Sequence, residues 1–192
     1  MLSRWQLPQK AVIGGKEYAI RGDFRNVLQV IAYLGDTRFP EYFRWRMALA
    51  LFYEGELLRK DHQQAMEYLG WFIRGGAEEE PRQEQALLDW EQDADLIVAD
   101  VNAVSGQEIR ACEFLHWWTF LSWFHAIGDG QLATVVRIRG KLRRGQKLEP
   151  WEKEYYLRNK SRVDMKRRYT PEELAQKEKL KKLLEGGSNG ER

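Results

Sequence analysis

The side chains that could do chemistry gather between residues 89 and 125. The stretch opens with a run of five carboxylates, at Asp89, Glu91, Asp93, Asp95 and Asp100. Asp89 and Asp93 would share one helix face, and paired carboxylates are part of what a divalent cation requires. The other ligands would have to come from elsewhere, because this run contains no histidine. We therefore expect no metal and interpret the run as a solvated acidic face or a docking face for basic side chains.

Nucleophilic catalysis has one candidate pair in this stretch, Cys112 and His116, four residues apart. On a helix, that spacing would let the imidazole activate a thiolate. Cys112 falls where the helix should pack, however, and buried cysteines are commonly inert. His116 and His125 are separated by about 900° of helical rotation, so they point to opposite sides and cannot share a metal. We expect no catalysis and no cofactor, and we interpret the chain as a binding protein.

Two helices must position these residues. Apolar side chains recur at steps of three and four along residues 83–104, which predicts a helix with one buried face and one acidic face. A second helix is predicted over residues 107–127, and the short Ser105-Gly106 joint favours an antiparallel pair. The second helix is apolar almost all round, so it is either surrounded by protein or in contact with a partner. The residues that we take as partner-binding are Trp117, Trp118, Trp123, Phe124, Asp89, Asp93, Arg137 and Arg139.

The remaining elements are predicted from turn and capping residues. Gly14-Gly15 between two apolar runs predicts a β-hairpin over residues 11–20. Further helices, with capping residues or glycine stops, are predicted from Asp23 to Gly35, over residues 39–54, from Asp61 to Gly75, and from Gly130 to near Gly140. The predicted fold class is therefore mainly α, a compact helical domain with a short N-terminal β-hairpin and a basic, partly extended C-terminal helical tail.

The tail is predicted to be separable from the body. Residues 1–140 form the predicted helical body, and residues 141–192 are basic with few apolar anchors. Thr170-Pro171 has the pattern of a helix start within the tail. The glycine-rich residues 186–190 are predicted to be disordered.

Composition excludes some classes of protein and shows a marked charge asymmetry. Hydrophobic residues make up 43% and charged residues 31% of the 192 residues, so a packed core is expected and a membrane-spanning chain is not. The single Cys112 excludes an internal disulfide and fits a reducing compartment. Residues 1–136 carry 13 Lys or Arg and 20 Asp or Glu, whereas residues 137–192 carry 18 and 9. Such a chain binds polyanions through its basic end or pairs its own halves.

The basic end also carries aromatic residues, at Trp151, Tyr155, Tyr156 and Tyr169. Basic residues interleaved with stacking rings are typical of proteins that bind single-stranded nucleic acid. Three glutamates, at Glu149, Glu152 and Glu154, interrupt this positive field. We therefore favour a protein partner or a self-contact over nucleic acid.

Three stretches carry a family resemblance: DWEQDADLI at residues 89–97, LHWWTF at residues 115–120 and VVRIR at residues 135–139. IGGKEYAI at residues 13–20, followed by Asp23-Phe24-Arg25, agrees with it. The chain resembles the siphophage "gene product fifteen" family. The resemblance implies a non-enzymatic phage or prophage protein of the bacterial cytoplasm, a tail assembly chaperone that acts on the tape measure protein.

The same resemblance leaves other partners and roles open. Tail tube subunits and a second copy of the chain are further partners compatible with a chaperone role, and no membrane partner is expected. Two other functions are a nucleic-acid-binding packaging accessory that uses the basic tail, and a structural head–tail or tail component of the virion.

Overall fold

The computed structural model describes residues 5–78, 87–166, 173, 175–176 and 178–179. Within these ranges the chain forms β1 (Lys10–Ile13), β2 (Lys16–Ala19), α1 (Phe24–Gly35), α2 (Glu41–Phe52), α3 (His62–Ile73), α4 (Ala94–Ser105), α5 (Trp117–His125), α6 (Gln131–Arg143), α7 (Pro150–Arg158) and α8 (Lys160–Val163). Two 3₁₀ turns, Arg59–Asp61 and Ile109–Ala111, lie ahead of α3 and α5. The predicted mainly-α fold with an N-terminal hairpin is confirmed.

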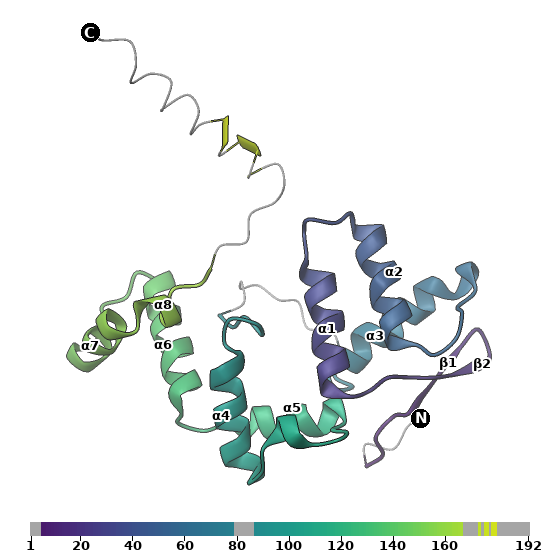
Figure 1. Ribbon diagram of the computed structural model, residues 1–192, viewed down its shortest axis with the longest axis horizontal. Helices are drawn as coiled ribbons and strands as arrows, with labels where there is room; N and C mark the ends of the chain where they lie inside the picture. The colour runs from purple at the N-terminus through teal and green to yellow at the C-terminus, as the bar shows by residue number, and fades with distance from the viewer. Residues whose placement is uncertain (1–4, 79–86, 167–172, 174, 177, 180–192) are drawn as a thin grey trace.

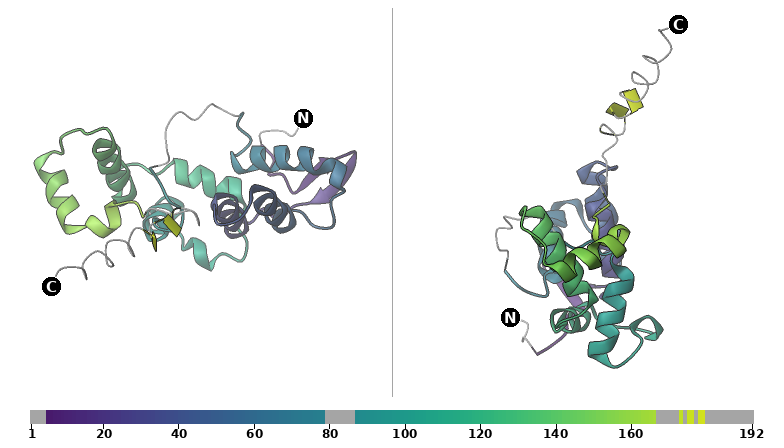
Figure 2. Two further views of the ribbon diagram at one scale, coloured as in Figure 1. Left: turned by 90° about the horizontal axis from the view of Figure 1, so that it is seen from above. Right: turned by 90° about the vertical axis from the view of Figure 1, so that its left-hand side faces the viewer.

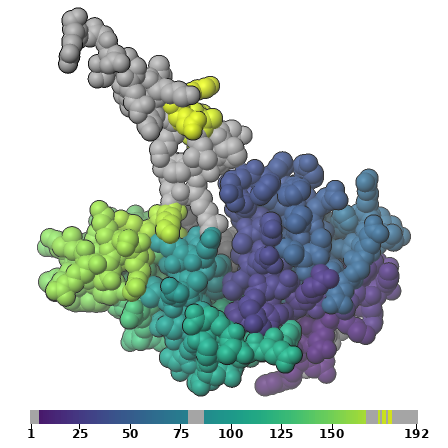
Figure 3. All heavy atoms as spheres, in the orientation of Figure 1, coloured from purple at the N-terminus to yellow at the C-terminus, as the bar shows by residue number. Residues whose placement is uncertain are grey.

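These elements form two lobes joined by α4 and α5 (Figure 1). The N-terminal lobe, residues 5–78, holds the hairpin and α1–α3, and the C-terminal lobe, residues 131–166, holds α6–α8. From above, α7 and the hairpin lie at opposite ends of the molecule (Figure 2). In the space-filling view the C-terminal lobe forms one end of the surface (Figure 3). The predicted partner-binding residues therefore lie in the connection and in the C-terminal lobe.

The hairpin forms where the glycine pair predicts it. Gly14 and Gly15 both adopt the left-handed region, with φ of 58° and 80°, which only glycine tolerates easily. In the resulting register Ile13 pairs with Lys16. Ile13 and Tyr18 are buried, and the Gly14 N–H donates to the side-chain oxygen of Gln64 on α3 at 2.8 Å. The hairpin is thus anchored on the helices.

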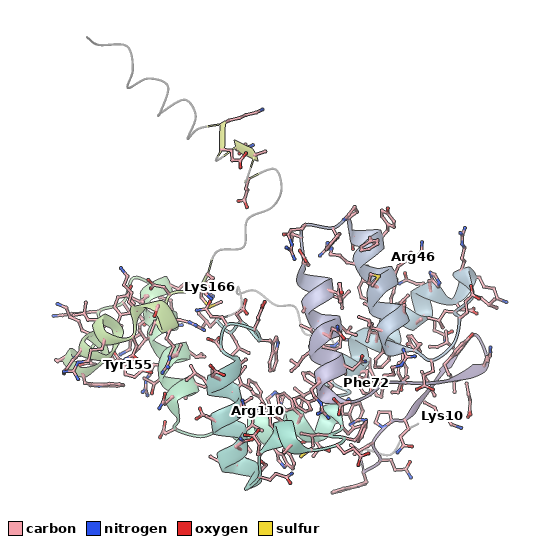
Figure 4. All side chains as sticks on the ribbon, in the orientation of Figure 1. Lys10, Arg46, Phe72, Arg110, Tyr155 and Lys166 are labelled. Atoms are coloured by element: carbon pink, nitrogen blue, oxygen red, sulfur yellow. The ribbon has the colours of Figure 1, made fainter. Side chains whose placement is uncertain are left out.

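An aromatic core runs from the N-terminal lobe into α5. Phe52 of α2 and Phe72 of α3 are fully buried, with ring centres 4.9 Å apart. Phe24, at the start of α1, stacks on Phe120 of α5 at 4.9 Å. Figure 4 labels Phe72 where α3 meets the base of the lobe. Ring packing therefore joins α5 to the N-terminal lobe.

The central helices differ from the prediction in their bounds and in their orientation. α4 begins at Ala94, and Trp90 lies in the preceding turn; residues 79–86 lie outside the described residues. The single helix predicted over residues 107–127 is wrong, because α5 begins only at Trp117. The antiparallel pairing is also wrong, since α5 lies across the lower end of α4 (Figure 1).

Polar side chains in the last turn of α4 and shortly after it explain why the second helix starts late. The side-chain oxygen of Asn102 accepts the Ile109 N–H at 2.9 Å, and the carboxylate of Glu108 accepts the Arg110 N–H at 2.9 Å. These bonds satisfy main-chain groups outside a helix and hold the 3₁₀ turn. The Arg110 guanidinium, hydrogen-bonded to the carboxylate, lowers the pKa of Glu108 to about 2. The carboxylate is therefore charged, and a strong acceptor, at neutral pH.

Much of the predicted tail is folded against the body. Val163 is fully buried, and the Gln92 side chain donates to the carbonyl of Asp164 at 2.8 Å and accepts the Lys166 N–H at 2.9 Å. α6 itself runs three residues past Gly140. The domain boundary after residue 140 stays a prediction. The helix start at Thr170-Pro171 and the glycine-rich end lie outside the described residues.

Candidate functional site

Arg139 makes five hydrogen bonds where the C-terminal lobe meets the segment before α4, one for each of its N–H groups. Nη1 and Nη2 donate to the two carboxylate oxygens of Asp93 at 2.6 and 2.8 Å, a bidentate pair. The other three bonds reach the carbonyls of Leu87 at 2.9 Å, Arg162 at 2.9 Å and Val163 at 2.7 Å. Arg139 is 4% exposed and Asp93 is 1% exposed. This arrangement, named here the Arg139 clamp, fastens the start of α4 and the end of α8 to α6.

Within the acidic run, Glu91 and Asp95 are exposed, whereas Asp89, Asp93 and Asp100 bond to groups of the chain itself. Asp93 lies in the Arg139 clamp, so for this residue the solvated-face interpretation is wrong and the alternative, docking of a basic side chain, is the one that the structure shows. Asp100 accepts the Leu132 N–H at 3.0 Å and so caps α6 from a neighbouring helix. A Cβ at Gly130 would lie 2.5 Å from that carboxylate, which explains the glycine there. Asp89 accepts two main-chain N–H groups of the turn before α4. These carboxylates stabilise the chain itself.

Arg139 occupies a position on α6 that normally holds an apolar side chain. Leu132, Val135 and Ile138 are buried on the same side of the helix, and Arg139 continues their spacing. A charged residue on an apolar stripe is a sequence signal for a buried ion pair, because an unpaired buried charge is very costly. The signal is present in the sequence, but it does not say which acidic residue is the partner.

Arg137 belongs to a second charged cluster, between α6 and α7. Its guanidinium lies 5.1 Å from the ring centre of Trp151, and its Nε lies 3.7 Å from a carboxylate oxygen of Glu152. Glu152 is 1% exposed and accepts hydrogen bonds from Lys141 Nζ at 2.6 Å and the Glu149 N–H at 2.8 Å. The bond from Lys141 lowers the pKa of Glu152, so the carboxylate stays charged.

Of the four predicted aromatic residues, three pack into the connection between the lobes. Trp117 is 1% exposed and donates from its indole nitrogen to the carbonyl of Ile73 at 2.9 Å. Phe124 lies 5.0 Å from Trp90, ring centre to ring centre, and both Phe124 and Trp123 are half-buried against the core. Packing accounts for these side chains, and a partner could reach Trp117 only if α5 moved.

Trp118 lies on the surface side of α5. Its indole nitrogen donates to the carbonyl of Phe72 at 2.9 Å, and its ring meets that of Trp71 edge-on at 5.2 Å. With Arg74 and Leu121 these rings line a surface hollow of about 770 Å³, named here the Trp71–Trp118 groove. The predicted partner contact through Trp118 is compatible with this position and stays a prediction.

His116 caps α5 and holds the segment before β1, residues 5–9, which is named here the N-terminal arm. The Trp118 N–H donates to Nδ1 at 3.1 Å, so the proton lies on Nε2, which donates to the carbonyl of Pro8 at 3.0 Å. Burial lowers the pKa of His116, although the bond to Pro8 acts in the opposite direction. Both ring nitrogens are thus occupied in the neutral form. His116 is not directed at Cys112, whose sulfur lies 3.9 Å from the carbonyl of Glu108.

The structure adds an apolar surface that the sequence pattern does not single out. Between α2 and α3 lies a hollow of about 810 Å³, named here the α2–α3 groove. Its apolar lining includes Tyr42, Trp45, Leu49, Leu57 and Met66, and its rim includes Glu41, Arg46, Glu56, Arg59 and His62. Figure 4 labels Arg46 on α2. The sequence of α2 could have indicated this groove, because its apolar residues are spread around the helix and do not all fit on one buried face.

Two further features bear on function classes. Among the described residues, no three His, Cys, Asp or Glu side chains come together as metal ligands. Within the same ranges, no helix combines the length and the apolar character needed to cross a bilayer.

The fold and its grooves define a small, mainly α protein with apolar surface hollows flanked by charged side chains. The sequence matches the family described as Bacteriophage Gp15 protein over residues 5–165. Because the match covers most of the chain, the protein belongs to this bacteriophage family. Searches of the curated proteins and of the solved structures gave no match. The resemblance carried by residues 89–97, 115–120 and 135–139 is confirmed at the level of the family.

Proposed function

We propose that the protein is a tail assembly chaperone that binds the tape measure protein through the α2–α3 groove. A tape measure protein is a very long helical chain with apolar stripes, which aggregates unless those stripes are covered before the tail tube forms. Covering a stripe requires a groove lined by large, adaptable apolar side chains, as in helix-in-groove recognition. Membership of the phage family supports the phage role, and the groove supports the mode of binding.

The lining of the α2–α3 groove is the observation that carries this proposal. Tyr42 lines the groove and is 69% exposed. Trp45 and Met66 also line the groove, and both are half-buried and packed against the hydrophobic core. Methionine adapts to irregular surfaces, and aromatic side chains provide most of the binding energy at many interfaces. Charges of both signs on the rim, such as Arg46 and Glu56, can pair with polar residues beside a client's apolar stripe.

The test is co-expression with the tape measure protein of the same phage, followed by affinity capture. Tyr42→Ala is expected to weaken capture from several-fold to about a hundredfold, as removal of an interface aromatic does. The matched control is Phe114→Ala, because Phe114 is 61% exposed and lies outside the groove. Equal capture by Tyr42→Ala and the parent protein would contradict the proposed site.

The same experiment compares the two grooves. Trp71→Ala removes one wall of the Trp71–Trp118 groove and leaves the lining of the α2–α3 groove in place. Loss of capture with Trp71→Ala, but not with Tyr42→Ala, would move the client to α5 and favour the partner contact predicted for Trp118.

A chaperone and a structural component of the virion differ in where the protein ends up. A chaperone is expected in infected-cell lysates and absent from purified particles. Quantitative mass spectrometry of purified virions measures this directly, with the tail tube subunit as the internal standard. A constant number of copies per particle would favour the head–tail or tail component instead.

A further inference from the structure

The C-terminal lobe carries a large surplus of positive charge. Residues 131–166 include 11 Lys or Arg and only 4 Asp or Glu, a balance of +7. Arg139, in its clamp with Asp93, is the buried cation of the lobe. The surplus is therefore a property of the lobe's surface.

The four carboxylates of the lobe are already engaged within it. Glu152 is buried beside Lys141, and Glu154 forms an ion pair with Arg158 at 2.7 Å. Glu149 forms a capping box with Glu152 at the start of α7, and Asp164 accepts the hydroxyl of Tyr156 at 2.9 Å. These carboxylates therefore offset particular neighbours, and other cations of the lobe carry its positive balance.

Several cations of the lobe are exposed without a carboxylate partner among the described residues. Lys147 precedes α7, Lys153 lies on α7, Lys160 opens α8 and Lys166 follows it. None of the ion pairs between described residues includes these four lysines. Figure 4 labels Lys166 where the chain leaves the lobe. These side chains are free to contact a polyanion.

An exposed ring lies within this positive surface. Trp151 is 50% exposed at the start of α7, and the guanidinium of Arg137 lies 5.1 Å from its ring centre. An exposed indole presents a flat surface on which a base can stack, and a nearby guanidinium adds a cationic contact for the adjoining phosphate. Bases inside a duplex are stacked on each other and cannot reach such a ring.

From these observations we infer that the C-terminal lobe binds single-stranded nucleic acid, through Trp151 as the stacking platform and the free lysines as phosphate contacts. An acidic peptide would satisfy the lysines but would not stack on the half-exposed indole, which Arg137 contacts. The exposed ring therefore favours a strand with bases. This site is separate from the α2–α3 groove and does not depend on the proposed chaperone role.

The experiment measures fluorescence anisotropy of a fluorescein-labelled oligothymidine of about 20 nucleotides, titrated with the full-length protein at several salt concentrations. Trp151→Ala is expected to raise the Kd at least about fivefold, the lower end of what removing one stacked base costs. The double variant Lys147→Gln with Lys153→Gln is expected to reduce the slope of log K against log salt by about 1.4, roughly 0.7 for each phosphate that is no longer neutralised.

Matched controls separate this surface from the rest of the protein. Lys60→Gln removes an exposed lysine of the N-terminal lobe, and Tyr42→Ala removes an exposed ring of the α2–α3 groove; neither is expected to change the Kd for the strand. Trp151→Phe keeps a ring and is expected to retain most of the affinity, which distinguishes a stacking role from unfolding of the lobe. Trp151→Ala is expected to capture the tape measure protein normally.

Three outcomes would overturn the inference. One is the absence of binding to the strand at low salt. Another is binding that is unchanged by Trp151→Ala and equally strong to heparin, which would show a general polyanion contact. The third is displacement of the strand by a polyglutamate peptide at lower concentration than by unlabelled oligothymidine, which would identify an acidic protein as the partner.

Discussion

The two lobes bury different kinds of side chain. In the N-terminal lobe the fully buried residues are rings and branched chains, such as Phe52, Phe72 and Leu69. The C-terminal lobe has a smaller apolar core and buries Arg139 and Glu152 within it, each with an oppositely charged partner. Apolar packing tolerates many arrangements, whereas a buried ion pair is stable only with its complete set of partners. We therefore expect the C-terminal lobe to be the less forgiving of the two.

The largest effect is expected from breaking the Arg139 clamp. Arg139→Met leaves the Asp93 carboxylate buried without its cation and three carbonyls without their donor. Loss of one partner of a buried pair typically costs about 3–5 kcal/mol in the free energy of unfolding. Urea unfolding measures the loss, and hydrogen exchange is expected to rise mainly in α6–α8. Exchange that rises equally in α1–α3 would show that the lobes do not differ in the proposed way.

A double variant sharpens the same point. Replacing both charges, with Arg139→Met and Asp93→Leu, removes the buried carboxylate along with its cation. We expect the double variant to be more stable than Arg139→Met alone, because an apolar pair of similar volume avoids the uncompensated charge. Urea unfolding of the two proteins side by side decides this. A double variant less stable than the single one would mean that the Asp93 carboxylate stabilises the protein even without Arg139, for example through the hydrogen bond that it accepts from the Asp89 N–H at 3.0 Å.

In the N-terminal lobe, Leu69→Ala is expected to cost about 3 kcal/mol, within the usual range for a buried leucine. Leu69 is fully buried on α3, so the variant leaves a cavity that neighbouring rings can partly fill. Hydrogen exchange is expected to rise in β1–α3 and to change little in α6–α8. A cost greater than that of Arg139→Met would reverse the ranking of the lobes.

A smaller, pH-dependent effect is expected at His116, where the N-terminal arm meets α5. Since burial lowers the pKa of His116, the unfolded chain binds a proton before the folded one does as the pH falls. The stability from the neutral ring is complete above the ordinary histidine pKa of about 6.5 and is lost as the pH drops below it. The urea concentration at the midpoint of unfolding is therefore expected to decrease as the pH is lowered from about 7.5 to about 5. His116→Asn, which can still cap α5, is expected to flatten this dependence; an unchanged slope would exclude His116 as its source.

The smallest effect on stability is expected from breaking an exposed ion pair in the C-terminal lobe. Arg158 and Glu154 are four residues apart on α7, and their side chains are 76% and 63% exposed. Solvent screens such pairs, so Arg158→Ala is expected to leave the urea midpoint almost unchanged. A large loss would mean that surface charges also hold the C-terminal lobe together.

The fold was predictable where the determinant is local. Gly14-Gly15, Asp23 and the Gly75-Gly76 stop mark a turn, a helix cap and a helix end through their own conformations, and the structure has them there. The helix predicted over residues 107–127 failed because Asn102 and Glu108 hold a turn that no apolar spacing reveals. Local patterns predict helices, but they do not show where polar side chains interrupt them.

The candidate site was less predictable because its determinants are far apart in the sequence. Asp93 and Arg139 both stand out as charged residues, but their 46-residue separation gives no reason to pair them. The aromatic composition of α5 indicates a partner surface there, whereas the larger apolar hollow lies between α2 and α3. Tyr42 of α2 and Met66 of α3 line one groove only because the two helices lie side by side, which the sequence does not show.

The Arg139 clamp also sets an order of events during synthesis. Asp93 leaves the ribosome 46 residues before Arg139, and the carbonyls of Arg162 and Val163 follow more than 20 residues later still. At about 5–20 residues per second, the carboxylate waits for seconds in water before its cation arrives, and longer before the cation has all its acceptors. The N-terminal lobe can therefore collapse while the chain is still growing, and the C-terminal lobe closes last. We further expect the clamp to be absent from the transition state of refolding, so that Arg139→Met mainly speeds unfolding and leaves the folding rate nearly unchanged.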